Sequence, residues 1–163
     1  NAEDKMSEIR DLEKMISEWK NIYLISQNLS KIEVNSLINS CDSFISLHRS
    51  EGFGLVIAES MYLGKPVIVT NWSGNTDFTN KENSCSISYD FIELKENYGP
   101  YEKGNRWAEP NLKESMECMK KLVYNKEFYS EKSKAGKQFI KQNFSDKYIA
   151  EIIKKRIDEL ENL

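Results

Sequence analysis

The chain has 163 residues, of which 23 are basic and 26 are acidic, so its formal net charge at neutral pH is -3. This length is typical of one domain, and we expect residues 1–163 to form one, with residues 109–163 as its helical C-terminal part. The small acidic excess gives no electrostatic reason to expect a nucleic-acid partner.

Apolar runs and cysteine spacing narrow the class of protein further. No apolar run approaches the ~20 residues that cross a bilayer. We therefore expect a cytoplasmic location, either free or peripheral to the inner face of a membrane. Cys41, Cys85 and Cys118 form no CxxC pair, so buried, reduced thiols are expected. With a single histidine, His48, a structural zinc site is not expected.

The first third of the chain predicts two helices and a strand. Apolar residues at intervals of three and four over residues 4–20 are typical of an amphipathic helix. A short strand is expected over residues 21–26. Ser30 and Glu33 have the spacing of a capping box, so a second helix should begin there and end near Cys41.

The middle of the chain alternates strands and helices. Strands are expected over residues 43–48 and 66–70, joined by a helix over 55–64 that Gly64 is placed to cap. Residues 84–89 could form a further strand, and residues 96–107 are expected to be a loop. This alternation predicts a mostly parallel sheet with helices on both faces.

The C-terminal third, from Glu109 to Leu163, predicts three helices, the last with Ser145 as a possible N-cap. Their apolar stripes are expected to belong to the core. Tyr101 and Trp107, just before them, are expected to pack against these helices.

Residues 51–54, Glu-Gly-Phe-Gly, lie between a predicted strand and a predicted helix. Such turns can present backbone amides and a positive helix end to an anion, and glycines let the backbone approach it. Glu51 and Glu59 could face one cleft and each accept hydroxyl donors, while Phe53 would anchor the turn in the core. By spacing alone, a ligand site and a purely structural turn are equally good interpretations. A nicotinamide dinucleotide is disfavoured because the third glycine of that fingerprint is missing.

The stretch SEGFGLVIAESMYLGKPVIVTNWSGNTDF, residues 50–78, closely resembles the signature of family 4 ("group 1") retaining glycosyltransferases. The likeness continues through NSCSISY and GPYEKGNRWAEPN, so it covers roughly residues 22–125. It implies the C-terminal, donor-binding half of a GT-B fold: an α/β, three-layer Rossmann-like parallel sheet with a helical C-terminal tail and its first strands missing.

The resemblance also implies roles for individual residues. Glu51 would contact hydroxyls of the donor sugar and stabilise charge near the anomeric carbon, and Glu59 would hold the ribose hydroxyls. The donor phosphates would meet the amides of Gly52, Phe53, Gly54 and Leu55. Weaker candidates are Asn28 and Leu29 for the base pocket and Arg49 for support near the donor; for His48 a structural hydrogen bond is expected. By position, the loop after the next strand is expected to line the donor site at the same edge of the sheet, with Trp72, Ser73, Gly74, Asn75 and Asp77, although Gly74 could simply permit the turn and Asp77 could cap a helix.

No metal cofactor is expected, because amides and basic side chains would neutralise the leaving diphosphate. The expected partners are a nucleotide sugar, an unidentified glycan, lipid or protein acceptor, and an upstream acceptor-binding domain of the same protein. The implied activity is retaining hexosyl transfer in polysaccharide biosynthesis, with this piece alone inactive. A non-catalytic nucleotide-sugar-binding or interaction module is the alternative. The incomplete sheet predicts self-association.

Overall fold

The computed structural model describes residues 2–162, in two compact units, Asn1–Val34 and Asn35–Leu163. Along the chain the elements are α1 (Ala2–Ile16), α2 (Lys31–Ser40), β1 (Phe44–Ser46), α3 (Leu55–Tyr62), β2 (Val67–Thr70), the 3-10 helix η1 (Gly74–Asp77), β3 (Cys85–Ile87), β4 (Tyr89–Glu93), β5 (Arg106–Pro110), α4 (Leu112–Tyr124), α5 (Lys126–Asn143) and α6 (Asp146–Glu161).

The first unit contains α1 and the start of α2. The predicted capping box is present: Ser30 N–H donates to Glu33 Oε2 at 2.7 Å, and Glu33 N–H donates to Ser30 Oγ at 3.3 Å. The Ser30 hydroxyl also donates to Glu33 Oε2, and this bond, together with the bond from the Ser30 N–H, lowers the pKa of Glu33. The predicted strand over residues 21–26 is wrong, because this segment has no regular structure and pairs with no described strand. A segment rich in residues that favour strands forms a strand only where a neighbouring strand pairs with its backbone.

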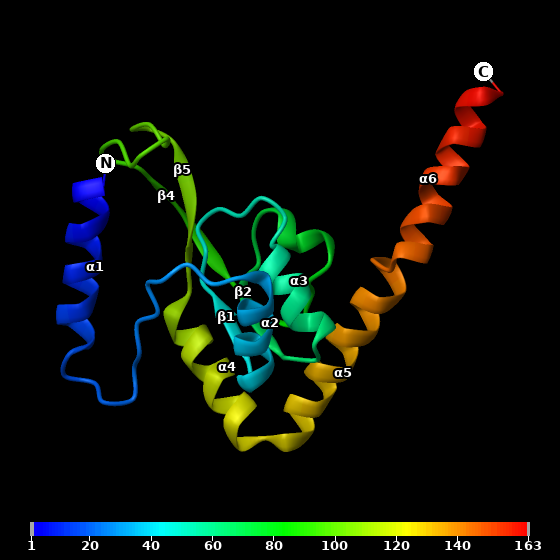
Figure 1. Ribbon diagram of the computed structural model, residues 1–163. Coiled ribbons are helices and arrows are strands. Elements are labelled where there is room, and N and C mark those ends of the chain that lie inside the picture. Colours follow the sequence, from blue (N-terminus) through cyan, green and yellow to red (C-terminus); the bar gives the residue numbers. More distant parts are fainter. Residues whose placement is uncertain (1, 163) are drawn as a thin grey trace. The chain divides into compact units, whose positions relative to one another are not determined.

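The second unit is built on a parallel sheet in the order β1-β2-β3 (Figure 1). Phe44 pairs with Val67, and Ile68 pairs with Cys85. The prediction that residues 43–47 and 66–70 form neighbouring parallel strands is therefore confirmed. Strand β1 is the end strand of this sheet, so one of its edges is not paired within the sheet.

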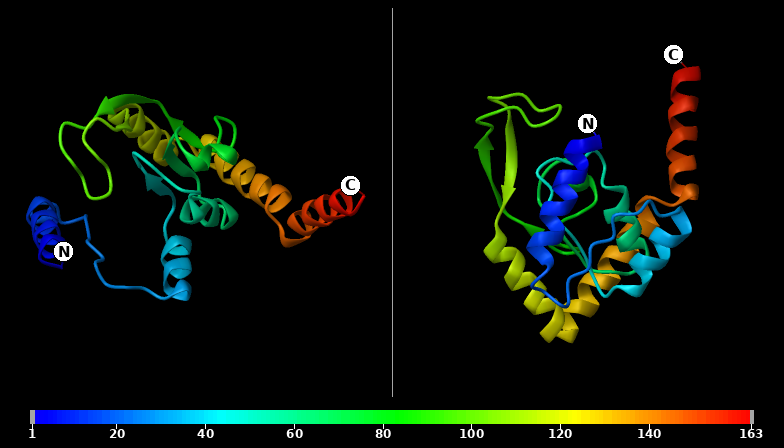
Figure 2. Two further views of the ribbon diagram at one scale, coloured as in Figure 1. Left: turned by 90° about the horizontal axis from the view of Figure 1, so that it is seen from above. Right: turned by 60° about the vertical axis from the view of Figure 1, so that its left-hand side comes forward.

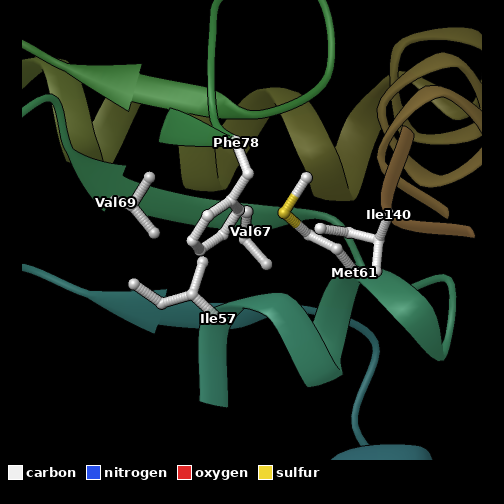
Figure 3. Packing of buried hydrophobic residues seen from close by; sticks show 6 residues of the cluster. All are labelled: Ile57, Met61, Val67, Val69, Phe78 and Ile140. Carbon is white, nitrogen blue, oxygen red and sulfur yellow. The ribbon is translucent and has the colours of Figure 1, made fainter. Parts of the chain in front are cut away.

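Helices cover both faces of the sheet, because alternate residues of β2 point to opposite sides. Val67 and Val69 pack on one face against α3 and the C-terminal half of α5, and Figure 3 shows them among Ile57, Met61, Phe78 and Ile140. On the other face, Ile68 packs with Leu122 of α4 and with residues of β3. The arrangement is the expected three-layer α/β architecture.

The three C-terminal helices are capped by polar side chains as their sequences suggest. Asn111, Asn125 and Ser145 each accept a hydrogen bond from the backbone three residues on. Helices α4 and α5 meet in a V beside the sheet, and α6 points away from the rest of this unit (Figure 2). The expectation that all three apolar stripes are core is wrong for α6, which buries none of its residues and exposes Tyr148, Ile149, Ile152, Ile153, Ile157 and Leu160.

Strands β4 and β5 form an antiparallel hairpin, with Phe91 opposite Ala108. Its second strand occupies part of the segment expected to be a loop and the start of the expected helical tail. The packing expected for Tyr101 and Trp107 is also wrong: Trp107 lies against Tyr98 and Tyr101, with ring centroids 5.4 and 6.0 Å apart. These rings stabilise the hairpin and its loop rather than the tail.

Candidate functional site

The candidate site lies in the second unit, where β1 and β2 end. The loop after β1, residues 47–54, leads into α3, and the loop after β2, residues 71–73, leads into η1. Because both strands are parallel and adjacent, the two loops emerge at the same edge of the sheet. Most of the predicted site residues fall on these two loops.

The carboxylate of Glu51 caps the turn that follows it. Oε1 of Glu51 accepts hydrogen bonds from the backbone N–H of Gly52 at 2.9 Å and of Gly54 at 3.1 Å. Two amides that converge on one oxygen form an anion-binding nest. At this turn two amides therefore converge on an anion, which is the side chain of Glu51 itself; their predicted role towards the donor phosphates stays a prediction.

Gly54 shapes this nest and starts α3. Its φ of 90° and ψ of 47° lie in the left-handed region, and an added Cβ would lie 3.0 Å from Ile57 Cδ1 and 3.4 Å from Phe78 Cζ. Phe53, expected in the core, is only partly buried, with 38% of its surface exposed, although its ring lies 5.1 Å from that of Phe78.

The loop after β2 is fitted closely onto the backbone of the loop after β1. A Cβ on Gly74 would lie 1.8 Å from the carbonyl oxygen of Gly52, so no side chain can be accommodated there. Ser73 Oγ donates to the carbonyl oxygen of Glu51 at 2.5 Å and accepts from its N–H at 3.3 Å. Ser73 and Gly74 therefore lie beside the Glu51–Gly52 peptide, at the predicted edge of the sheet.

Ser73 also carries backbone strain. Its φ of 76° and ψ of -158° make it the only non-glycine residue with a positive φ in the described part of the chain. This region is occupied almost exclusively by glycine, and a side chain there costs about 1–3 kcal/mol. Such strain persists only where neighbouring contacts enforce it.

His48 ties the two loops together, as its expected structural hydrogen bond suggested. Its Nε2 lies 3.1 Å from the carbonyl oxygen of Trp72 and 3.0 Å from Oδ1 of Asn75. The amide nitrogen of Asn75 already donates to Thr70 O and Thr79 Oγ1. Both groups facing Nε2 are therefore acceptors, which fixes the proton on Nε2 and leaves Nδ1 facing Ser46 Oγ at 3.1 Å.

Arg49 points toward the β4–β5 hairpin. Its guanidinium donates to Glu109 at 2.5 and 3.0 Å and lies 5.1 Å from the centre of the Trp107 ring. The hydrogen bond to Glu109 raises the pKa of Arg49. The backbone joins in, since Ala108 N–H donates to the carbonyl oxygen of Arg49 at 3.2 Å. In the structure Arg49 thus fastens the hairpin to the loop that carries Glu51.

A pocket of about 390 Å³ opens beside Glu51, between the start of α3 and strand β1. It is lined by Phe44, Ser46, Glu51, Phe53, Gly54, Leu55, Val56 and Ile57. Glu59, partly buried in the second turn of α3, is not among the lining residues. This pocket therefore includes Glu51 and Gly54, one of the two nest residues, but neither Gly52 nor Glu59. Asn28 and Leu29 belong to the first compact unit, Asn1–Val34.

The position of Asn75 suggested a lining residue, but the sequence did not reveal its buried, structural role. It is fully buried and makes side-chain bonds to Thr70, Thr79 and His48. An asparagine in a polar loop is ordinarily interpreted as a turn residue. Asn75 is buried because the loop after β2 packs against His48, where its side chain links that histidine to Thr70 at the end of β2.

Metal-binding groups, membrane-spanning helices and cysteines are the other features for which the sequence sets an expectation. No group of three or more His, Cys, Asp or Glu side chains that could hold a metal occurs among residues 2–162. No helix in that range is long and apolar enough to cross a membrane. All three cysteines are free, but Cys41 is exposed, contrary to expectation. Burial raises the pKa of the Cys85 thiol to about 12.

Comparison with known proteins identifies similar chains. The family model "Glycosyl transferases group 1" matches residues 17–139. The chain is 27% identical over 149 residues to "Putative glycosyltransferase 48" of the Sulfolobus islandicus filamentous virus. This alignment covers 88% of this chain and 46% of the viral protein. The chain thus spans about half the length of that relative.

Solved structures show the same fold at low sequence identity. The crystal structure of Anabaena Alr3699/HepE in complex with UDP and glucose aligns with a TM-score of 0.67 and 16% identity, over 99% of this chain and 37% of that one. The C-terminal domain of the group 1 glycosyltransferase LpcC from Francisella tularensis aligns with a TM-score of 0.63 and 16% identity, over 88% of this chain and 64% of that one. The expected fold class, part of a GT-B architecture, is confirmed.

Proposed function

Because this chain belongs to the group 1 glycosyltransferases, we propose that it is the donor-binding part of an enzyme that transfers a sugar from a nucleoside diphosphate to an acceptor with retention of configuration. The observation that carries the proposal is the pair of amides, Gly52 and Gly54, that converge on one carboxylate oxygen at the start of α3. The geometry that holds a carboxylate there also suits a phosphate oxygen.

In this proposal the diphosphate of the donor takes the place that Oε1 of Glu51 occupies in the nest. The amides of Gly52, Phe53, Gly54 and Leu55 then face the phosphates, with the positive end of α3 behind them. Glu51 turns toward the sugar, where its carboxylate accepts from hydroxyl groups and stabilises positive charge at the anomeric carbon. The pocket beside Glu51 provides the space for this rotation of the Glu51 side chain.

The reaction breaks the bond between the anomeric carbon and the diphosphate oxygen, which keeps the electron pair. An acceptor hydroxyl forms the new bond on the same face of the sugar and passes its proton to an oxygen of the departing diphosphate. We assign the stabilisation of the leaving diphosphate to the nest amides and the helix end, without a metal. Glu59 is the candidate for the ribose hydroxyls.

UDP-glucose is the first donor to test, because the similar Anabaena protein was crystallised with UDP-glucose. Isothermal titration calorimetry of the chain with UDP and with UDP-glucose should give saturable binding of both. Glu59→Gln should weaken the binding of both, since a neutral amide is the poorer acceptor for ribose hydroxyls. Lack of binding across a panel of uridine, guanosine, adenosine and thymidine diphosphate hexoses would refute the proposal.

A further inference from the structure

The strained backbone of Ser73 is matched by a specific set of contacts. Its hydroxyl bonds to both the N–H and the carbonyl oxygen of Glu51. Its own carbonyl oxygen accepts from Thr76 N–H at 3.1 Å and Thr76 Oγ1 at 2.7 Å. The carbonyl oxygen of the preceding Trp72 accepts from His48. The carbonyl groups of Trp72 and Ser73 are thus both held by hydrogen bonds, and the Ser73 hydroxyl bonds to Glu51.

The residue types at positions 73 and 74 are informative together. At position 74 glycine is required by space, because a Cβ would overlap the carbonyl oxygen of Gly52. At position 73 the backbone conformation favours glycine, yet the chain has serine. A glycine there would remove the strain and would also remove both bonds to Glu51. Serine at position 73 therefore provides the hydroxyl that bonds to Glu51, although its backbone conformation is strained.

The two bonds from Ser73 act on the peptide groups either side of Glu51. They restrict its φ and ψ, and these angles set both the direction of its side chain and the direction of the Gly52 N–H. That N–H is one of the two amides of the nest. Ser73 therefore controls the geometry of the nest and of the carboxylate without lining the pocket beside them.

We propose that Ser73 is a positioning residue for donor binding, which holds Glu51 and the Gly52 amide in place through its hydroxyl. This inference rests on the proposed function and adds to it a residue that acts through Glu51. A purely structural serine would instead serve to stabilise the fold. The two roles make opposite predictions for a glycine at this position, since glycine adopts the observed conformation without strain.

The test compares Ser73→Gly, Ser73→Ala and the wild-type chain by thermal unfolding and by calorimetric titration with UDP and UDP-glucose. Ser73→Gly should have an unchanged or higher Tm and bind UDP-glucose about tenfold more weakly, the size of effect expected from the loss of two ordinary hydrogen bonds. Ser73→Ala should lose the same affinity and also lower the Tm, because it keeps the strain without the bonds. Ser43→Gly, the same exchange in the loop before β1, is the control; it should leave the affinity unchanged and lower the Tm only slightly, because glycine adds entropy to the unfolded chain.

The outcomes separate this inference from the function on which it rests. If the wild-type chain binds no member of the panel of nucleoside diphosphate hexoses, the proposed function and the role of Ser73 both fail; if it binds only another member, that ligand replaces UDP-glucose in the comparison. If it binds both, and Ser73→Gly binds UDP-glucose within twofold of the wild type, only the role of Ser73 is refuted. A Ser73→Gly variant whose affinity loss is accompanied by a lower Tm would likewise show that the serine serves the fold.

Discussion

Exchange of Glu51 for glutamine should tighten the binding of UDP, although it alters the residue proposed to act in the reaction. The reason is that Oε1 of Glu51 and the diphosphate would use the same amides, those of Gly52 and Gly54. The carboxylate is therefore an internal competitor for the donor phosphates. The glutamine variant keeps the shape of the side chain but has a weaker acceptor and no charge.

The size of this effect follows from two contributions. Hydrogen bonds to charged groups contribute about 1.5–3 kcal/mol each, but Glu51 is only partly buried. We therefore take less than 1 kcal/mol for the weakened competition, since solvent screens partly exposed charges. Removing a negative charge near the diphosphate adds about 0.5–1 kcal/mol, judged from about 1 kcal/mol for unit charges 4 Å apart in water. Together they amount to about 0.5–2 kcal/mol, which corresponds to a UDP Kd about two- to thirtyfold lower.

Calorimetry with UDP and UDP-glucose at one fixed ionic strength provides the assay. The Kd of UDP should fall, whereas the Kd of UDP-glucose should not fall in parallel, because the sugar hydroxyls need the carboxylate. Glu59→Gln is the matched control, as it removes the same charge eight residues further along the chain, in α3, but should weaken UDP binding. An equal gain in UDP affinity for both variants would indicate a general charge effect and refute the competition; so would the absence of any gain for Glu51→Gln.

Four further outcomes are expected. Arg49→Ala should speed hydrogen exchange in residues 89–110 at a cost below about 1 kcal/mol, because its ion pair is partly exposed; a large loss of UDP affinity would instead mean that Arg49 contacts the donor. Gly74→Ala should destabilise the chain by about 1–3 kcal/mol in urea unfolding, since its Cβ would overlap a backbone oxygen; an unchanged midpoint would contradict the observed contact. Below pH 9 a thiol reagent should modify exposed Cys41 rapidly and leave Cys85, with its pKa of about 12, unmodified until unfolding; equal rates would show that Cys85 is accessible. The edge of β1 around exposed Ile45 should promote self-association, measured by light scattering, and a monomer at all concentrations would be the contrary result.

The sequence predicted the central βαβ unit well because its local signals agree with its burial. Residues 67–70 are all buried, as a continuous β-branched run suggests for a strand covered on both faces. Helix α3 ends where Gly64 was expected to cap it, with Gly64 N–H donating to the carbonyl oxygen of Met61. In this region propensity, turn residues and packing all favour the same structure.

The errors occur where structure depends on distant partners. Residues 21–26 have a strand-like sequence but no described strand beside them. The β4–β5 hairpin was missed because its strands are joined by residues 94–105, a much longer connection than hairpins usually have. Alternating aromatic residues from Tyr89 to Phe91 were the available signal. Helix α6 shows the converse case, since an amphipathic pattern predicts an apolar face but not what that face contacts.

The site itself was predictable in composition but not in its contacts. The Glu51 turn and the loop of Ser73 were both assigned to one edge of the sheet from strand order alone. That Ser73 bonds to the backbone of Glu51 could not be predicted, because the two residues are 22 positions apart and the bond depends on how two loops approach. The same holds for His48 and Asn75, which are 27 positions apart.

These long-range contacts explain how a strained residue and an anion nest can coexist at the end of a sheet. His48 and Asn75 fix the loop after β2 against the strands, and Gly74 allows it to touch the Gly52 carbonyl oxygen. Because both loops are held, the backbone of Ser73 cannot move to an unstrained conformation without breaking its hydrogen bonds to Glu51. The nest amides are then oriented before any phosphate arrives, so binding need not order them. Since preorganised amides stabilise charge without reorganisation during the reaction, the rigidity of these two loops is itself part of the proposed catalysis.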